Sequence, residues 1–259
     1  MEYPEYWRMV AKLCDFAFQP IVDIHSGRIF GVEALLRGHE AVGFSSVKDV
    51  FESACQSGML NRFELYLREK VMHKFRSIPG SGRLQLFINI DNRVMEMPGY
   101  DPGITGELML RHGLRPDQVC FELSEQHAFK CFDRTREILS AYRAMGSRIA
   151  LDDYGTGFSG LELLYHSEPD FIKMDRFFVN GIERDHKKQL FVAGIARMAR
   201  TLGVSMIAEG VESAAELAVC RDLGCDLVQG WVIQKPTLDI NGLLDCYPVG
   251  VVQLELAIA

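Results

Sequence analysis

The 259-residue sequence lacks the features that would mark a secreted or membrane-spanning protein. It has seven cysteines, an odd number, and none of them form the C-x-x-C pair of redox and zinc motifs. We therefore expect reduced thiols that mostly fill the core of a cytoplasmic protein. No apolar run approaches the length of a membrane span, and residues 1–16 lack the apolar stretch of a signal peptide.

Positive charge is also scarce. The chain has 28 lysines and arginines against 35 aspartates and glutamates, which gives a net charge of −7. This balance argues against a nucleic-acid polymer as partner, because such a partner needs a basic surface. It does not exclude a small anionic ligand, because bound cations reverse the local charge of a carboxylate site.

Apolar strand-like runs alternate with helix-like segments along almost the whole chain. The ranges 16–24 and 28–36 flank His25-Ser26-Gly27, which predicts a hairpin. Further strands are expected at 84–90, 119–124, 148–152, 171–175, 204–209 and 226–230, and helices at 46–78, 103–112, 131–145, 183–202 and 213–223. This alternation predicts an α/β fold, a modified (β/α)8 TIM-like barrel in which the opening hairpin makes one strand antiparallel.

The domain organisation is expected to be simple. No Pro-, Gly- or Ser-rich stretch divides residues 1–259, so we expect a single domain. Residues 251–259 read VVQLELAIA and are more apolar than a free tail should be. We therefore expect residues 241–259 to form a C-terminal extension, or the start of a link to a further domain.

Polar side chains close nearly every predicted strand. Along the chain these residues are Glu33, Asn89, Glu122, Asp152, Asp153, Lys173, Asp175, Glu209 and Gln229. In a barrel such strand ends meet at one rim, where barrel enzymes have their active sites. Each residue taken alone is more often a helix cap, a turn residue or a solvated charge, and Lys173 could be a paired core lysine. Only the whole set of residues at the strand ends indicates a functional rim.

The adjacent carboxylates Asp152 and Asp153 are the most informative part of this set. Neighbouring carboxylates repel one another, so we expect either a basic side chain or a metal ion to offset them. Carboxylates and amides gathered in this number suit Mg²⁺ or Mn²⁺, which prefer oxygen ligands. We predict that Asp152 bridges two ions and that Asp153 binds the second, as in sites that hydrolyse phosphoesters.

These residues lie in a series of motifs that resembles the EAL domain, the family of cyclic di-GMP phosphodiesterases. Glu33-Ala34-Leu35 is the signature from which the family takes its name. The other motifs follow in family order: FQPIVD (18–23), FINID (87–91), FELSE (121–125), LDDYGTGFSG (151–160), FIKMD (171–175), IAEGVES (207–213) and QGWVIQKP (229–236). The resemblance covers residues 14–240 and implies a modified (β/α)8 barrel with one antiparallel strand.

The resemblance also implies roles for the matching residues. The first metal ion would be bound by Glu33, Asn89, Glu122 and Asp152, and the second by Asp152, Asp153 and Glu209. The catalytic groups would be Glu209, Lys173 and Asp153. Lys173 would orient the attacking water, and Glu209 would be either a metal ligand or the general base, which the sequence leaves open. The dinucleotide pocket would be lined by Gln19, Leu36, Arg37, Asp175, Glu212 and Gln229.

The loop that begins at Asp153 is implied to couple the metal site to a dimer interface. Glu125 would anchor this loop, and Gly155 and Gly157 would let it move.

The implied function is hydrolysis of cyclic di-GMP to linear 5′-pGpG by a homodimer, often within a longer chain that carries GGDEF-type or other regulatory domains. The alternatives are a non-catalytic cyclic di-GMP receptor and an interaction module that mainly dimerises. The chain departs from the family pattern at Asp91, where serine is usual, and at Trp231, where Tyr or Phe is usual.

Overall fold

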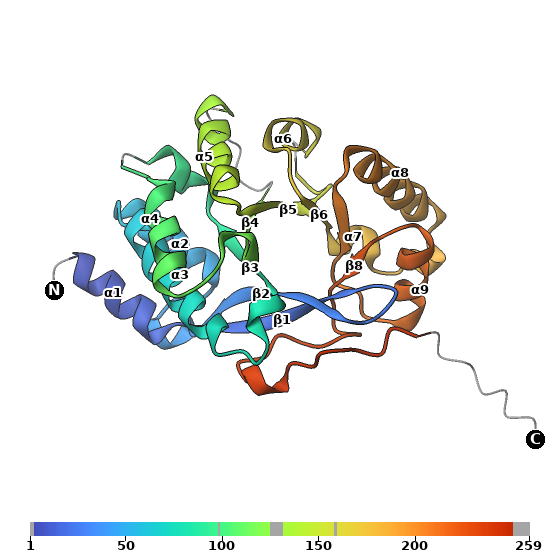
Figure 1. Ribbon diagram of the computed structural model, residues 1–259, viewed down its shortest axis with the longest axis horizontal. Helices are drawn as coiled ribbons and strands as arrows, with labels where there is room; N and C mark the ends of the chain where they lie inside the picture. The colour runs from blue at the N-terminus through green and yellow to red at the C-terminus, as the bar shows by residue number, and fades with distance from the viewer. Residues whose placement is uncertain (1–2, 98, 125–131, 158–159, 251–259) are drawn as a thin grey trace, which may run out of the picture.

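The computed structural model describes residues 3–97, 99–124, 132–157 and 160–250. Eight strands form a closed barrel in chain order, and the helices lie around its outside (Figure 1). The strands are β1 (Asp15–Asp23), β2 (Ile29–Arg37), β3 (Gln85–Ile90), β4 (Val119–Ser124), β5 (Arg148–Tyr154), β6 (Phe171–Met174), β7 (Ser205–Ala208) and β8 (Leu227–Val228). The helices are α1 (Tyr3–Leu13), α2 (Val47–Gln56), α3 (Leu60–Arg76), α4 (Pro102–Arg111), α5 (Phe132–Met145), α6 (Gly160–Ser167), α7 (Arg176–Val179), α8 (His186–Leu202) and α9 (Ala214–Asp222).

One strand runs against the others. β1 pairs antiparallel with both β2 and β8, whereas every pair from β2 and β3 to β7 and β8 is parallel. The predicted hairpin turn is stabilised by Asp23, whose carboxylate accepts hydrogen bonds from the backbone of His25 and Ser26. The expected modified (β/α)8 barrel with one antiparallel strand is confirmed.

The helices differ from the prediction in two respects. The expected helix at 46–78 is wrong as one element, because α2 ends at Gln56 and α3 begins at Leu60. Gly58 lies between them with a φ of 70°, a conformation that breaks a right-handed helix. The sequence reasoning also missed α1, α6 and α7.

Among the described residues, none of the helices has the length and apolar character needed to cross a bilayer.

The side chains inside the barrel form two layers. The lower layer is apolar and consists of Ile21, Phe87, Cys120, Ala150, Phe171, Ile207 and Leu227. Alternate residues of a strand share a face, so the residue two positions nearer the rim also points inward. Those positions, together with Glu33 of β2, form the upper, polar layer: Gln19, Asn89, Glu122, Asp152, Lys173, Glu209 and Gln229. One apolar floor therefore lies beneath the ring of polar side chains.

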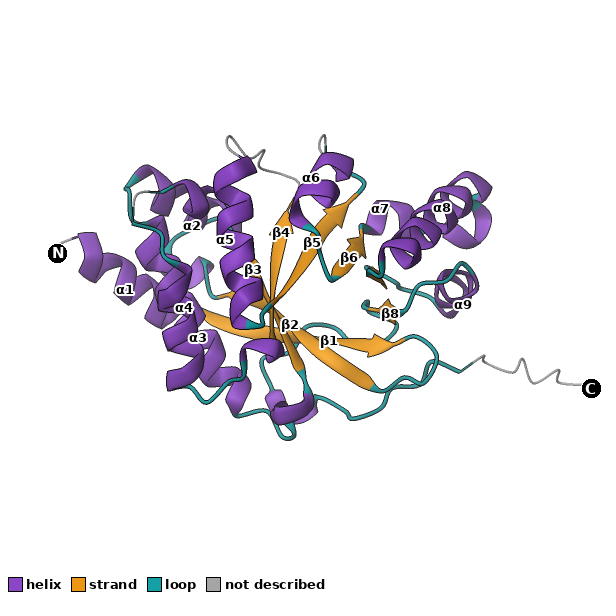
Figure 2. Ribbon diagram, turned by 45° about the horizontal axis from the view of Figure 1, so that its top comes forward, coloured by secondary structure: helices purple, strands orange, loops and turns teal. Residues whose placement is uncertain are grey.

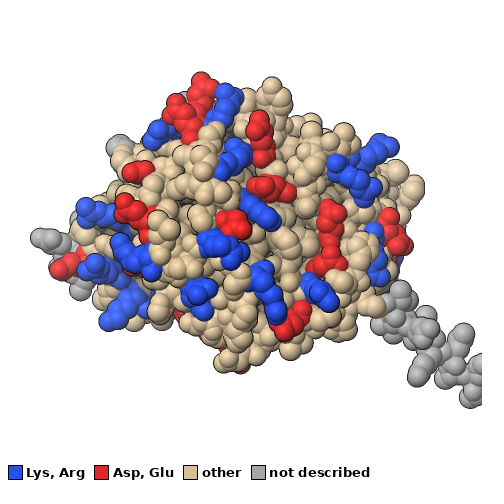
Figure 3. Space-filling view, viewed as in Figure 1, with Lys and Arg blue, Asp and Glu red and all other residues tan. Residues whose placement is uncertain are grey.

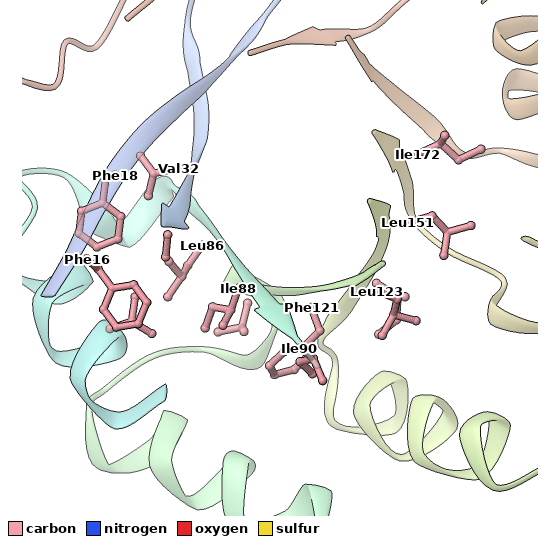
Figure 4. Packing of buried hydrophobic residues seen from close by; sticks show 14 of the residues in the cluster. Phe16, Phe18, Val32, Leu86, Ile88, Ile90, Phe121, Leu123, Leu151 and Ile172 are labelled. Carbon is pink, nitrogen blue, oxygen red and sulfur yellow. The ribbon is translucent and has the colours of Figure 1, made fainter. Parts of the chain in front are cut away.

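The outward faces of the same strands pack against the helices. Figure 4 shows Leu86 and Ile88 of β3 and Leu123 of β4 on this outer side, and all three are buried. The arrowheads of β4, β5 and β6 end on the same side of the barrel (Figure 2). Apolar packing on both faces of the strands thus fixes the strand ends and presents the polar layer at one rim.

Candidate functional site

The ammonium group of Lys173 lies at the centre of the polar layer. Its Nζ atom is 2.6 Å from Oε1 of Glu122, 2.8 Å from Oδ1 of Asp152, 2.8 Å from Oε1 of Glu209 and 3.5 Å from Oε2 of Glu33. The lysine is 1% exposed. One positive charge therefore faces four carboxylates in a region that is shielded from water.

Burial and charge shift the pKa values of this cluster. Burial raises the pKa of Glu122 well above its usual range, and the attraction to Lys173 only partly offsets this. The pKa of Glu209 is raised for the same reasons. Burial alone would lower the pKa of Lys173, but the surrounding carboxylates outweigh this effect and raise it well above its usual value. The lysine thus stays charged, and the surplus of carboxylates favours a further cation.

Two amide side chains contact the carboxylates. Asn89 is exposed at the rim, and its Nδ2 donates to Oε1 of Glu33 at 3.1 Å and to Oε2 of Glu122 at 3.0 Å. Gln229 donates to Oε2 of Glu33 at 2.5 Å and to Oε1 of Gln19 at 3.1 Å. The two ends of an amide have nearly the same shape, so a flipped Asn89 would direct its oxygen at the gap between the carboxylates. In that orientation it suits a cation.

Asp152 and Asp153 both reach the site because β5 is irregular where they lie. The register of β5 against β6 shifts between Leu151 and Tyr154, and Asp153 has a φ of 54°. In a regular strand the two side chains would point to opposite faces. The left-handed conformation of Asp153 costs about 1–3 kcal/mol and brings its carboxylate back toward the site. Such strain is typical of functional residues.

The carboxylates gather in two groups that share Asp152. One oxygen from each of Glu33, Glu122 and Asp152 lies within 4.8 Å of the others, and the same holds for Asp152, Asp153 and Glu209. Oxygen donors at this spacing fit a Mg²⁺ or Mn²⁺ ion. A carboxylate that belongs to two adjoining groups suits a pair of ions about 3.5–4 Å apart.

Pockets flank the carboxylates on two sides. The larger, of about 400 Å³, extends toward α2 and α3 and is lined by Leu36, Arg37, Lys48 and Arg93 among others. The smaller, of about 240 Å³, is lined by Gln19, Asp175, Glu212, Gln229 and Trp231 among others. Leu35 and Asp153 line both. A ligand that fills both pockets would therefore pass over the carboxylates.

The structure divides the predicted substrate-binding residues between these pockets. Leu36 and Arg37 line the larger pocket, and the other four line the smaller one. The residues predicted as ligands or catalytic groups all meet at the rim. On the face shown in Figure 3, acidic and basic side chains are interspersed rather than gathered into one basic surface.

The predicted loop residues are only partly described. Gly155 has a φ of 101°, and a Cβ atom there would lie 2.7 Å from Cε2 of Phe178. The loop therefore packs closely on α7 at this point. Gly157 lies two residues further along, next to the end of a described range. Glu125, the expected anchor, lies outside the described residues.

Sequence reasoning missed several basic residues that line the pockets, among them Arg176, Lys48 and Arg93. Arg176 pairs with Oε1 of Glu212 at 2.6 Å in the smaller pocket. Its position directly after Asp175, at a strand end, was a signal that could have identified it. Lys48 on α2 and Arg93 in the turn after β3 line the larger pocket, and only the tertiary fold brings them there.

Comparison with known proteins agrees with this geometry. The sequence matches the EAL domain over residues 9–236. The chain belongs to the EAL domain family. MucR of Pseudomonas aeruginosa, named a bifunctional diguanylate cyclase/cyclic di-GMP phosphodiesterase, is 30% identical over 222 residues, which cover 85% of this chain and 32% of MucR. PdeB of Escherichia coli, named a probable cyclic di-GMP phosphodiesterase, is 30% identical over 220 residues, which cover 84% of this chain and 42% of PdeB.

Solved EAL structures show the same fold. BlrP1 of Klebsiella pneumoniae, in a complex with calcium and cyclic di-GMP, superposes with a TM-score of 0.80 at 34% identity, over 91% of this chain and 58% of BlrP1. A phosphodiesterase structure of MucR with cyclic di-GMP gives a TM-score of 0.78 at 27% identity, over 91% of this chain and 96% of that one. The chain spans about a third of the length of the curated relatives that it matches.

Replacing Lys173 with methionine tests the charge balance of the polar layer. Lys173→Met leaves four carboxylates, of which Glu33 and Glu122 are buried, without the cation that they contact, so we expect a loss of about 3–5 kcal/mol in the free energy of unfolding. Denaturant unfolding near neutral pH, without added divalent ions, measures the loss. Lys12→Met, at an exposed position of α1, is the control and should change stability by less than about 0.5 kcal/mol. Equal stability of the two variants would contradict the account.

Proposed function

We propose that the chain is a metal-dependent phosphodiesterase that hydrolyses cyclic di-GMP to linear 5′-pGpG. The observation that carries this proposal is the pair of carboxylate groups that share Asp152. Their position between two pockets suits a ligand with two similar halves and a phosphodiester over the carboxylates. The cyclic di-GMP complexes of BlrP1 and MucR, and the name of PdeB, support the choice of substrate.

The donor set supports two hard divalent ions. Glu33, Asn89, Glu122 and Asp152 would hold the first ion, and Asp152, Asp153 and Glu209 the second. All the donors are oxygens, which favours Mg²⁺ or Mn²⁺. A structure of BlrP1 with manganese and cyclic di-GMP supports the same class of ion. When bound, such ions lower the pKa of water and neutralise phosphate charge.

The side chains of the polar layer would direct the attack of water on one phosphodiester. Lys173 is buried and charged, and its N–H groups contact Asp152 and Glu209. The same N–H groups can donate to the attacking water and so orient it. Glu209 is either a ligand or the base that accepts the proton of that water. Attack in line with the leaving oxygen opens the ring and releases the linear dinucleotide.

The two pockets would hold the two guanosine halves. In the larger pocket, Arg37 and Lys48 can pair with a phosphate, and Phe16 and Phe51 supply apolar surface for a base. In the smaller pocket, the carboxylate of Glu212 can accept hydrogen bonds from donors on the edge of guanine. Adenine presents a different set of donors there, so this pocket favours guanine.

Turnover with and without divalent ions tests the proposed reaction. Cyclic di-GMP should yield pGpG in Mg²⁺ or Mn²⁺ and none in excess chelator, as followed by chromatography. Glu33→Ala should lower turnover by at least about a hundredfold, because it removes a ligand of the first ion. Glu107→Ala, at an exposed position of α4, is the matched control and should leave the rate unchanged. Tight binding of cyclic di-GMP without turnover would instead favour the non-catalytic receptor.

Glu209→Gln separates the two roles of that residue. Glutamine keeps an oxygen ligand but cannot accept the proton of the attacking water. If Glu209 is the base, kcat should fall by about 10²–10⁴-fold while Mn²⁺ affinity stays within about threefold of the wild type. If it is chiefly a ligand, the Mn²⁺ affinity should fall as well. Calorimetric titration with Mn²⁺ and steady-state kinetics distinguish these results.

We further propose that the chain forms a homodimer and that the loop at Gly155 and Gly157 couples the dimer interface to the metal site. We also propose that the chain works within a longer protein in the cytoplasm. The length of the curated relatives supports a longer protein, and the free cysteines of the described ranges support a reducing compartment. Leu161 and Tyr165 on α6 and Phe177 on α7 are exposed apolar side chains that a second copy of the chain could cover.

Sedimentation analysis tests the proposed dimer. The isolated chain should sediment as a dimer at micromolar concentrations, and Phe177→Ser should shift it toward monomer. Leu110→Ser on α4, which is 74% exposed but lies on another helix, is the matched control and should leave the dimer intact. A wild-type monomer at these concentrations would contradict the proposal.

A further inference from the structure

A buried polar network at the wall of the larger pocket joins α3, α4 and α5. Its centre is Arg68 of α3, which is 2% exposed. The guanidinium Nη1 donates to the hydroxyl oxygen of Thr105 at 2.9 Å and to those of Tyr100 and Tyr142 at 3.3 Å each. Its Nη2 pairs with Oε2 of Glu64, one helical turn earlier.

Glu64 links this network to the end of β3. Its second oxygen, Oε1, accepts a hydrogen bond from the backbone N–H of Asp91 at 2.7 Å. Asp91 lies two residues after Asn89, whose amide contacts the carboxylates of the candidate site. Glu64 is 3% exposed and lines the larger pocket. Helix α3 is therefore tied directly to the backbone that carries Asn89.

Other contacts hold the same turn through its side chains. Asn92 donates to the backbone carbonyl of Ser124, at the end of β4, at 2.7 Å. The carboxylate of Asp91 binds the guanidinium of Arg93, whose Nη1 lies 2.6 Å from Oε2 of Glu52 on α2. In these contacts the side chains of the turn bind groups on neighbouring elements. Glu64 instead comes from α3 and accepts a hydrogen bond from the backbone of the turn. A hydrogen bond from an amide to a charged carboxylate is among the stronger ones.

Stability alone does not account for a carboxylate at position 64. Burial raises the pKa of Glu64 to about 6, although Arg68 and the Asp91 amide both act to lower it. A buried ion pair brings little or no stability over well-packed apolar side chains of similar size. Apolar residues at positions 64 and 68 could join the same helices, but they could not hold the backbone of the turn.

We propose that Glu64 is a positioning residue for the metal site, which fixes the end of β3 through the Asp91 amide and so holds Asn89 in place for the first ion. This inference rests on the proposed function, because it takes Asn89 as a ligand. Contacts that orient metal ligands from outside typically change metal affinity by about 10–100-fold. The predicted effect therefore appears in the binding of the ion itself, before any substrate is added.

Calorimetric titration with Mn²⁺ alone tests the inference without turnover. Glu64→Ala should weaken Mn²⁺ binding about tenfold or more. It should also speed hydrogen exchange at the Asp91 amide, which loses its acceptor. Glu64→Gln combined with Arg68→Met keeps an oxygen for that amide and removes the guanidinium that would compete for it, so Mn²⁺ affinity should return to within about threefold of the wild type even without the ion pair.

Tyr142→Phe is the matched control. It removes a hydroxyl that Arg68 contacts at 3.3 Å and leaves the turn after β3 untouched. It should lower stability and leave Mn²⁺ affinity unchanged. If Glu64→Ala does not fold, Glu64→Asp provides the same test, because the shorter side chain keeps its charge but draws the acceptor away from Asp91.

The outcomes separate this inference from the proposed function. Wild-type Mn²⁺ affinity in Glu64→Ala, or an equal loss of affinity in Tyr142→Phe, would overturn the positioning role alone. A wild-type chain that does not bind Mn²⁺ at all would overturn the proposed function, and the positioning role with it. Weak Mn²⁺ binding by Glu64→Ala, restored in the double variant Glu64→Gln with Arg68→Met, is the result expected from the structure.

Discussion

The contact between Lys173 and four carboxylates is the interaction on which the rest of the structure depends. The lysine stays charged at 1% exposure because Glu33, Glu122, Asp152 and Glu209 surround it. The carboxylates in turn tolerate their mutual repulsion because the lysine lies among them. Only a closed barrel can arrange this, since each side chain comes from a different strand. The apolar layer beneath them keeps water away from one side, which strengthens every charge interaction above it.

The same arrangement lowers the stability of the folded state and makes the site chemically useful. Buried carboxylates with raised pKa values and the left-handed backbone of Asp153 both oppose folding. The packing of apolar side chains on both faces of the strands offsets these terms. What results is a rim with more negative charge than one lysine neutralises, next to pockets that carry arginine and lysine side chains. Such a rim suits divalent ions, and through them a phosphodiester.

The sequence predicted the fold and the polar layer because both follow from short-range patterns. Period-two alternation places Glu122 two residues after Cys120, and the same rule places Lys173 after Phe171. The sequence predicted Asp153 at the site, but it could not show that a bulge within β5 brings it there, because that bulge depends on pairing with β6. The Glu64–Arg68 pair also escaped notice, since an i,i+4 pair of opposite charge in a helix usually lies on the surface. Burial of that pair is decided by α4 and α5, which are distant in the sequence.

The anomalous scattering of manganese in crystals grown with Mn²⁺ would locate the bound ions. Two peaks are expected about 3.5–4 Å apart with Asp152 between them. One peak should lie among Glu33, Asn89 and Glu122, and the other beside Asp153 and Glu209. A single peak, or peaks away from Asp152, would contradict the claim that the two carboxylate groups form one two-metal centre.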